Sequence, residues 1–277
     1  IPNFHSPAFN PQHMKYRHLS LCLLLLFALA GCQSECPKCP EAPPATDTPK
    51  AHENPHTVTF PSADSLPITA NVYQASETAP IIVLCHQARF NKSEYNGIAE
   101  RLNDMGFTCI AIDQRSGGPI ASHQNETWLA AKAAGKGTDF LDAEQDIRAA
   151  VDHISAQHDG AEVILWGSSY SSTLVLYVAA DHPKVRAVMS FSPGNYFAED
   201  KGDLPEILKD FEKPMFITCG KREAEQAKGV YGDKTLNENQ ELFVPEGAGH
   251  HGSRALWPNQ DGGEEYWAAV TAFLKKL

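Results

Sequence analysis

The sequence predicts an α/β domain over residues 57–277, with a mostly parallel central sheet, helices on both faces and no large lid domain. Short apolar segments of strand length alternate with segments in which apolar residues recur at helical spacing. This alternation is typical of a parallel sheet covered by helices. The chain of 277 residues, 42% of them hydrophobic, is also long and apolar enough for the core of one large domain.

The predicted elements follow one another to the end of the chain. Two segments alternate at period two and predict an opening hairpin, at 58–60 and 68–73. Apolar runs predict six further strands at 81–85, 109–112, 163–166, 187–191, 215–219 and 242–244. Helical spacing predicts helices at 95–105, 143–154, 174–180 and 266–274. Residues 121–137 fit neither pattern, and we expect them to form a surface excursion near the site.

Composition and charge exclude several classes of protein. The 19 Gly and 19 Pro are ordinary numbers, so collagen-like and wholly disordered chains are excluded. The formal net charge of −11 argues against a nucleic-acid partner, because phosphate contacts need a positive surface. No apolar run reaches the roughly 18–20 residues that a membrane-spanning helix needs.

The N-terminal segment has the layout of a secretory signal peptide. A basic segment, Met14–His18, precedes an almost unbroken apolar run from Leu19 to Ala30. Residues 1–13 precede the first plausible initiator and are left out of the fold prediction. We therefore expect residues 1–31 to consist of upstream residues and a signal peptide. Two kinds of signal fit this layout: a lipoprotein signal, or an ordinary secretory signal in which the cysteine at position 32 has no role.

The signal ends in Leu29-Ala30-Gly31-Cys32, which resembles the lipobox of bacterial lipoproteins. The resemblance implies cleavage before Cys32, lipidation of that cysteine and attachment to a membrane through the lipid. The residue after the lipidated cysteine is Gln33 and not Asp, and in this the sequence resembles lipoproteins that are sorted to the outer membrane. The expected location is thus the bacterial cell envelope, on the outer membrane facing the periplasm. Residues 32–56 are rich in proline and predict an extended tether.

The other cysteines indicate no metal site. Cys36 and Cys39 form a C-x-x-C pair within the tether, without the second ligand pair that a metal site needs. Cys85, Cys109 and Cys219 lie in apolar strand segments, where a small buried thiol is the expected interpretation. The neighbouring His250 and His251 lack the additional ligands of a metal motif, and no glycine-rich nucleotide motif follows any strand, so we expect neither metal nor cofactor.

The most specific chemical signal is Trp166-Gly167-Ser168-Ser169-Tyr170-Ser171, between a predicted strand and a predicted helix. A G-x-S-x-G sequence in this setting predicts a sharp turn that raises the serine hydroxyl clear of the sheet. Ser169 is therefore the candidate nucleophile. Ser171 stands where glycine is usual, and Ser168 is a competing hydroxyl one position away from the apex.

A serine nucleophile needs a histidine base that is oriented by a carboxylate. In this architecture the acid and then the histidine follow the serine along the chain. Glu223 is the candidate acid because it follows the strand at 215–219, and Glu225 is the alternative. His250 and His251 follow the strand at 242–244 and are the candidate bases.

Residues from about 80 to 270 resemble the α/β-hydrolase superfamily, in particular its dienelactone-hydrolase-like branch, with a serine in place of the cysteine nucleophile. The landmarks that carry the resemblance are 84–87, 113–118, the Ser169 turn, 190–194 and 251–254. The resemblance favours His251, which precedes a glycine. It implies an oxyanion hole formed by the N–H groups of Tyr170 and Ala88, with Gln87 as the alternative to Ala88. Most relatives use Asp where this chain has Glu223.

The resemblance implies a carboxylic ester hydrolase that cleaves small acyl substrates through a Ser169–His251–Glu223 triad and an acyl-enzyme intermediate. A peptidase or amidase with the same triad is the first alternative, and a non-catalytic envelope binding protein is the second. We expect structural roles for His86, Asp113 and Arg115. Trp128, Tyr196, Phe197 and Trp257 are candidates for pocket lining or for packing. The oligomeric state is not indicated.

Overall fold

The computed structural model describes residues 55–120 and 122–277. The predicted signal peptide, Cys32, the C-x-x-C pair and almost all of the tether lie outside the described residues. Among the residues that are described, no helix combines the length and the apolar character needed to cross a membrane.

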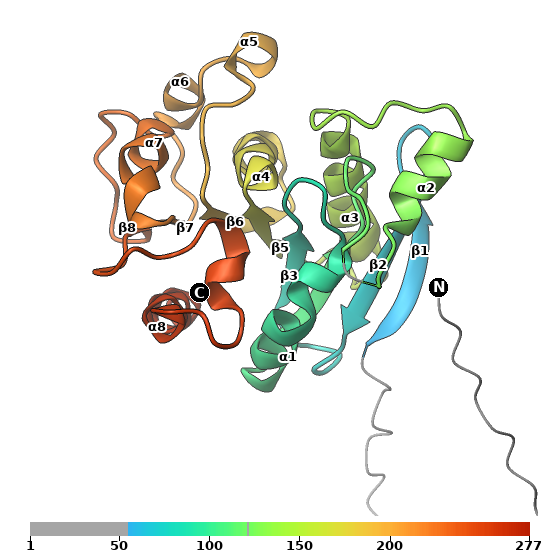
Figure 1. Ribbon diagram of the computed structural model, residues 1–277, viewed down its shortest axis with the longest axis horizontal. Helices are drawn as coiled ribbons and strands as arrows, with labels where there is room; N and C mark the ends of the chain where they lie inside the picture. The colour runs from blue at the N-terminus through green and yellow to red at the C-terminus, as the bar shows by residue number, and fades with distance from the viewer. Residues whose placement is uncertain (1–54, 121) are drawn as a thin grey trace, which may run out of the picture. The chain divides into compact units, whose positions relative to one another are not determined.

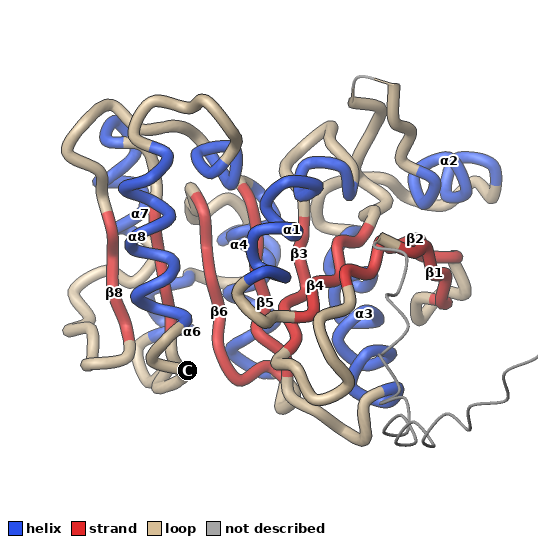
Figure 2. The backbone as a smooth tube through the Cα atoms, turned by 90° about the horizontal axis from the view of Figure 1, so that it is seen from below, coloured by secondary structure: helices blue, strands red, loops and turns tan. Residues whose placement is uncertain are grey.

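An eight-stranded sheet runs through the molecule in the order β1-β2-β4-β3-β5-β6-β7-β8, which Figure 2 shows from one edge to the other. Strand β2 pairs antiparallel with both β1 and β4, and all other neighbouring strands are parallel. The predicted opening hairpin and mostly parallel sheet are thus confirmed. The strands are β1 (His56–Pro61), β2 (Pro67–Tyr73), β3 (Ile81–Cys85), β4 (Thr108–Ile112), β5 (Val163–Ser168), β6 (Val185–Phe191), β7 (Met215–Thr218) and β8 (Gln240–Phe243).

Helices cover both faces of this sheet (Figure 1). The helices over 96–104 and 263–274 lie on one face, and the helices over 143–157 and 170–181 lie on the other. The α-helices are α1 (Asn96–Asp104), α2 (Glu126–Ala133), α3 (Ala143–Gln157), α4 (Tyr170–Asp181), α5 (Ala198–Lys201), α6 (Leu204–Leu208), α7 (Ala224–Gly229) and α8 (Gly263–Leu274). Short 3₁₀ helices are η1 (Lys92–Tyr95), η2 (Lys221–Glu223) and η3 (Gly252–Leu256).

The core consists of two apolar layers, one on each face of the sheet. Alternate side chains of a strand enter opposite layers, so Ile82 and Leu84 of β3 pack with α1 and α8. Val83 and Cys85 of the same strand pack on the other face with α3 and α4. Every residue of β3 is buried, which explains why the central strands are continuously apolar in sequence rather than alternating.

The prediction of an irregular excursion at 121–137 was wrong in part, because α2 occupies Glu126–Ala133. Only Thr127 and Ala131 of this helix are buried, so no apolar stripe marks it in the sequence. Its start is held by Asn125, whose side chain accepts a hydrogen bond from Trp128 N at 2.7 Å. The helix is therefore specified by its cap and by its place on β2 rather than by periodicity.

Helix α4 begins four residues before the predicted helix at 174–180. The side chains from Tyr170 to Ala179 are all buried, so the helix carries no polar face by which its start can be recognised. The short helices α5, α6 and α7 were not predicted either. Their four to six residues are too few to establish a helical period.

The parallel strands end at the same edge of the sheet, where the loops after β3, β5, β6, β7 and β8 gather. This edge is where active sites of open α/β sheets form. Residues from all five loops meet there in the candidate site.

Candidate active site

Ser169 lies at the apex of the turn between β5 and α4. Its backbone has φ 58° and ψ −124°, a strained conformation for a residue with a side chain. A Cβ atom on Gly167 would lie only 2.5 Å from the carbonyl oxygen of Ser171, so the close approach of the two backbones requires glycine at position 167. The turn predicted from the sequence is present, and it raises the Ser169 side chain above the sheet.

Ser171, the departure from the usual glycine, fits into this turn through two hydrogen bonds. Its hydroxyl donates to the carbonyl oxygen of His86 at 2.6 Å and accepts from Gln114 Nε2 at 2.6 Å. The side chain is fully buried between the nucleophile turn and the loop after β3. Serine at this position therefore links the two loops, and it is compatible with the turn.

The structure brings Ser169, His251 and Glu223 together. His251 Nε2 lies 2.8 Å from Ser169 Oγ, and His251 Nδ1 lies 2.5 Å from Glu223 Oε1. His251 immediately precedes η3, and Glu223 ends η2, so three separate loops supply the three side chains. A continuous hydrogen-bonded path thus runs from the carboxylate through the imidazole to the serine hydroxyl.

The three competing residues, His250, Glu225 and Ser168, take no part in this path. The backbone N–H of His250 donates to Tyr266 Oη at 3.3 Å. Within the described residues, neither the His250 side chain nor that of Glu225 makes a hydrogen bond or an ion pair. Ser168, the competing hydroxyl, is fully buried beneath the turn. The geometry therefore favours Ser169, His251 and Glu223 over all three alternatives.

The pKa values of His251 and Glu223 are shifted as in an ion pair. The hydrogen bond that His251 Nδ1 donates to Glu223 raises the pKa of His251 above its ordinary value, although burial opposes this effect. Burial alone would raise the pKa of Glu223, but hydrogen bonds from His251 and Ser192 outweigh it and hold that pKa below its ordinary value. The carboxylate therefore stabilises the protonated imidazole that proton transfer from Ser169 would create.

Ser192 supports the triad, a role that its place in the 190–194 segment of the sequence did not indicate. Its hydroxyl donates to Glu223 Oε2 at 2.7 Å and accepts from the backbone N–H of Gly252 at 2.8 Å. The same carboxylate oxygen accepts from Gly220 N at 3.1 Å. Because Gly252 follows His251, Ser192 holds the acid and the histidine loop together.

Two backbone N–H groups are available for an oxyanion. Tyr170 is the first residue of α4, where the N–H has no partner within the helix. In the loop after β3, Gln87 N donates to Glu94 Oε2 at 2.8 Å and is therefore occupied. No hydrogen bond among the described residues occupies the N–H of Ala88. The structure thus favours Ala88 over Gln87 as the second donor.

The three residues expected to be structural make extensive hydrogen bonds. Buried His86 accepts from Gln114 N at 3.0 Å, and burial lowers the pKa of its imidazole to about 4. Asp113 accepts from the backbone N–H groups of Lys92 and Glu126. Arg115 is bonded to Asp64 and Asp146. Each of them stabilises the loops around the site.

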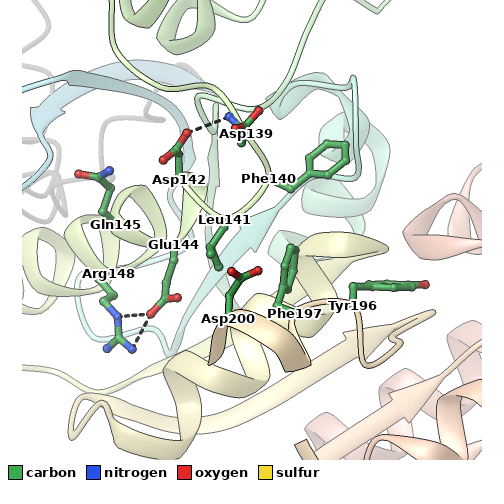
Figure 3. Close-up of a pocket in the computed structure, with 10 residues that line it drawn as sticks. All are labelled: Asp139, Phe140, Leu141, Asp142, Glu144, Gln145, Arg148, Tyr196, Phe197 and Asp200. Atoms are coloured by element: carbon green, nitrogen blue, oxygen red, sulfur yellow. Dashed lines mark hydrogen bonds and ion pairs between the residues drawn. The ribbon is translucent and has the colours of Figure 1, made fainter. Parts of the chain in front are cut away.

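A pocket of about 780 Å³ is lined by residues from the segments 139–148 and 196–200 (Figure 3). Phe140 forms part of its wall and contacts the Tyr170 ring, with the ring centroids 4.6 Å apart. Of the four aromatic residues that were candidates for pocket lining, Tyr196 and Phe197 line this pocket, whereas Trp128 and Trp257 do not. The complete lining is Asp139, Phe140, Leu141, Asp142, Glu144, Gln145, Arg148, Tyr196, Phe197 and Asp200.

No set of three or more His, Cys, Asp or Glu side chains in the described part of the chain is arranged to hold a metal ion. The site itself presents a serine hydroxyl, an imidazole, a carboxylate and two backbone N–H donors. Together these groups are suited to acyl transfer.

The fold and the family match define a hydrolase of the α/β type. Residues 76–221 match the family model described as serine aminopeptidase, S33, and the chain belongs to this family. The matched segment includes Ser169, Tyr170 and Ala88, and it ends before Glu223 and His251.

Solved structures of hydrolases share the fold. An esterase from Pyrococcus furiosus superposes with a TM-score of 0.62 at 17% sequence identity, covering 80% of this chain and 92% of that one. A dienelactone hydrolase from Anabaena variabilis gives a TM-score of 0.57 at 17% identity, covering 79% of this chain and 96% of that one.

Among curated proteins, an acyltransferase from Aspergillus calidoustus is 25% identical over an alignment of 227 residues, and the match covers 78% of this chain. The chain spans 63% of the length of that relative.

Proposed function

We propose that this protein hydrolyses carboxylic esters of small acyl substrates, with Ser169 as nucleophile, His251 as general base and acid, and Glu223 as the orienting carboxylate. The observation that carries the proposal is the hydrogen-bonded path from Glu223 through His251 to Ser169, with distances of 2.5 and 2.8 Å. Few functions other than nucleophilic catalysis require a strained serine, an imidazole and a carboxylate in this order.

In the proposed reaction, Ser169 Oγ attacks the ester carbonyl carbon while its proton passes to His251 Nε2. The negative charge that develops on the carbonyl oxygen is stabilised by the N–H groups of Tyr170 and Ala88. His251 then gives the proton to the departing alcohol, which leaves an acyl group on Ser169. Water, deprotonated by His251, attacks this acyl-enzyme, and the carboxylic acid is released as Ser169 regains its proton.

The surroundings of the triad support a small and accessible substrate. The side chain of His251 is 44% exposed. The segment between β6 and β7 holds only the short helices α5 and α6, so it does not form a large lid. The pocket whose wall includes Phe140 offers aromatic contacts for an acyl or alcohol group, and the carboxylates of Asp139, Asp142, Glu144 and Asp200 give its lining an acidic character (Figure 3).

A fluorophosphonate probe and p-nitrophenyl esters of increasing acyl length test this proposal. We expect the wild-type protein to react with the probe and to hydrolyse short-chain esters fastest. Ser169→Ala should abolish both reactions, and His251→Ala should nearly abolish them, while His250→Ala serves as the matched control with activity retained. An unlabelled, inactive wild-type protein would overturn the proposal and favour a non-catalytic binding protein. Fastest turnover of long chains would overturn the substrate size alone.

Hydrolysis of peptide or amide bonds is the second candidate, favoured by membership of the serine aminopeptidase family. The same triad serves both reactions, but an amine leaving group depends more strongly on protonation by His251. Aminoacyl p-nitroanilides compared with the matching p-nitrophenyl esters distinguish the two. A kcat/KM for the anilide comparable to that for the ester would establish the peptidase function in place of the esterase.

We further propose that the domain is anchored to the outer membrane of a bacterial cell envelope, facing the periplasm, through a lipid on Cys32. The proposal is supported by the lipobox-like sequence Leu29–Cys32 and by the proline-rich segment after it. Expression with an alkyne-labelled fatty acid tests it, because Cys32→Ser should remove the label and Cys36→Ser should retain it. Equal labelling of both variants, or none in the wild type, would refute lipidation at Cys32.

A further inference from the structure

Glu94 is a buried carboxylate that the proposed reaction does not use. It lies in η1 and is only 1% exposed. The helix is held in place at its start, where Asn91 Oδ1 accepts from Ser93 N at 2.9 Å and Asp113 accepts from Lys92 N at 2.8 Å. Burial raises the pKa of Glu94 to about 7. A carboxyl group is costly to bury, so its contacts need an explanation.

The first contact of Glu94 is with the loop that supplies the oxyanion hole. Oε2 accepts from the backbone N–H of Gln87 at 2.8 Å, and Oε1 accepts from Gln87 Nε2 at 3.3 Å. These bonds fix the backbone of Gln87 and leave the next N–H, that of Ala88, free for the substrate. The carboxylate therefore determines which N–H group of this loop is available.

The second contact is with the nucleophile turn and, through it, with the histidine loop. Ser168 Oγ donates to Glu94 Oε1 at 2.8 Å and accepts from Ser253 N at 2.9 Å. Gly252 approaches so closely that a Cβ atom on it would lie 2.6 Å from Ser168 Oγ. The loop that carries His251 thus rests directly on the residue before the nucleophile.

This arrangement repeats the one on the acid side. On the acid side, the Ser192 hydroxyl donates to Glu223 and accepts from Gly252 N. On the other side, the Ser168 hydroxyl donates to Glu94 and accepts from Ser253 N. Two carboxylate–serine pairs therefore hold the two successive N–H groups that follow His251. Only the first pair contains a residue of the triad.

We propose that Glu94 is a positioning residue that holds the oxyanion loop, the nucleophile turn and the histidine loop in their reactive arrangement, an inference that rests on the serine hydrolase chemistry proposed above. Its loss releases the Gln87 backbone on one side and the Ser168–Ser253 link on the other. Because both effects act on groups that stabilise the transition state, the consequence falls on kcat rather than on KM.

The test compares Glu94→Ala, Glu94→Gln and Ser168→Ala with the wild type, using p-nitrophenyl acetate. Labelling to completion with a fluorophosphonate counts the active sites, so that kcat is expressed per folded site. We expect Glu94→Ala to lower kcat by about 100-fold, the lower end of the loss of one oxyanion donor, with little change in KM. Glu94→Gln retains an oxygen acceptor for the Gln87 N–H and should recover part of the rate.

Asp146→Asn is the matched control. Asp146 is also a fully buried carboxylate, but its hydrogen bonds in the described structure go to Arg115 alone. We expect it to lower the melting temperature and to leave kcat per labelled site unchanged. If Glu94→Ala fails to fold, Ser168→Ala, which cuts only the link to the histidine loop, should still lower kcat.

A kcat per labelled site equal to that of the wild type in both Glu94→Gln and Ser168→Ala would overturn the positioning role. This result leaves the proposed function intact, because the wild type still turns over the ester. An inactive and unlabelled wild type would instead refute the proposed function itself.

Discussion

Replacing Glu223 by glutamine removes one negative charge and two acceptor sites from the centre of the triad. Glu223 Oε1 faces His251 Nδ1, while Oε2 accepts from Ser192 Oγ at 2.7 Å and Gly220 N at 3.1 Å. An amide has only one oxygen, so it cannot satisfy both sides. If its NH₂ faces Nδ1, the imidazole carries its proton on Nε2 and cannot accept the Ser169 proton. If its NH₂ faces Gly220 instead, the amide N–H and the backbone N–H of Gly220 are two donors that face each other without an acceptor.

The expected loss can be bounded from the exposure of the pair. In a buried serine protease triad, the reversed tautomer lowers kcat by about 10⁴-fold. Here the Glu223 side chain is 26% exposed and that of His251 is 44% exposed, so water can replace part of the lost interaction. We therefore expect kcat to fall by about 10²- to 10⁴-fold, or roughly 2.7–5.4 kcal/mol of activation free energy.

Steady-state hydrolysis of p-nitrophenyl acetate, normalised to labelled sites, measures this change. Glu225→Gln is the matched control, since Glu225 is exposed and lies two residues further along the chain. It should retain the activity of the wild type. A Glu223→Gln variant with wild-type kcat would refute the assignment of the acid, and a loss in Glu225→Gln alone would transfer the role to Glu225.

Three further predictions concern the turn, the pH profile and the core. Gly167→Ala places a Cβ atom 2.5 Å from the backbone oxygen of Ser171. It should lower the free energy of unfolding, measured with urea, by about 1–3 kcal/mol and should slow fluorophosphonate labelling. Unchanged values of both would contradict the close approach. Activity needs neutral His251, and the hydrogen bond to Glu223 raises the pKa of that imidazole. We therefore expect kcat/KM to decrease as the pH is lowered, with a midpoint above pH 6.5, and we expect a lower midpoint in Glu223→Gln. An unshifted midpoint would show that the pair is not coupled. Arg115→Met leaves the buried Asp146 carboxylate unpaired and should lower the free energy of unfolding by about 3–5 kcal/mol, with a loss below 1 kcal/mol refuting this role.

The parallel sheet could be predicted because strands that are buried on both faces leave short continuous apolar runs in the sequence. Strands such as Ile81–Cys85 are covered on both faces and are continuously apolar. The helical pattern failed at Glu126–Ala133, where few residues are buried, and at the start of the helix Tyr170–Asp181, where all faces are buried. Helical spacing identifies a helix only when one of its faces is buried and another is exposed.

The candidate site divides in the same way. The Ser169 turn is local, since a strand, small residues and a helix within a few positions define it, and it could be predicted from spacing. Between neighbours such as His250 and His251, or Glu223 and Glu225, local sequence offers no physical distinction. The choice depends on loops about 28 and 82 residues apart, which the sheet brings together.

Glu94 and Ser192 illustrate what no pattern along the chain could reveal. Each is a polar residue in a short segment, and its role depends on atoms of Ser168, Gly252 or Ser253, far away in sequence. Amino-acid order alone determines the layers of this hydrolase and its nucleophile turn, because periodic burial and steric limits on the backbone act over a few residues. Which imidazole, which carboxylate and which N–H groups meet is decided only in the folded protein, because hydrogen bonds require atoms about 3 Å apart, and only the packed sheet sets these distances.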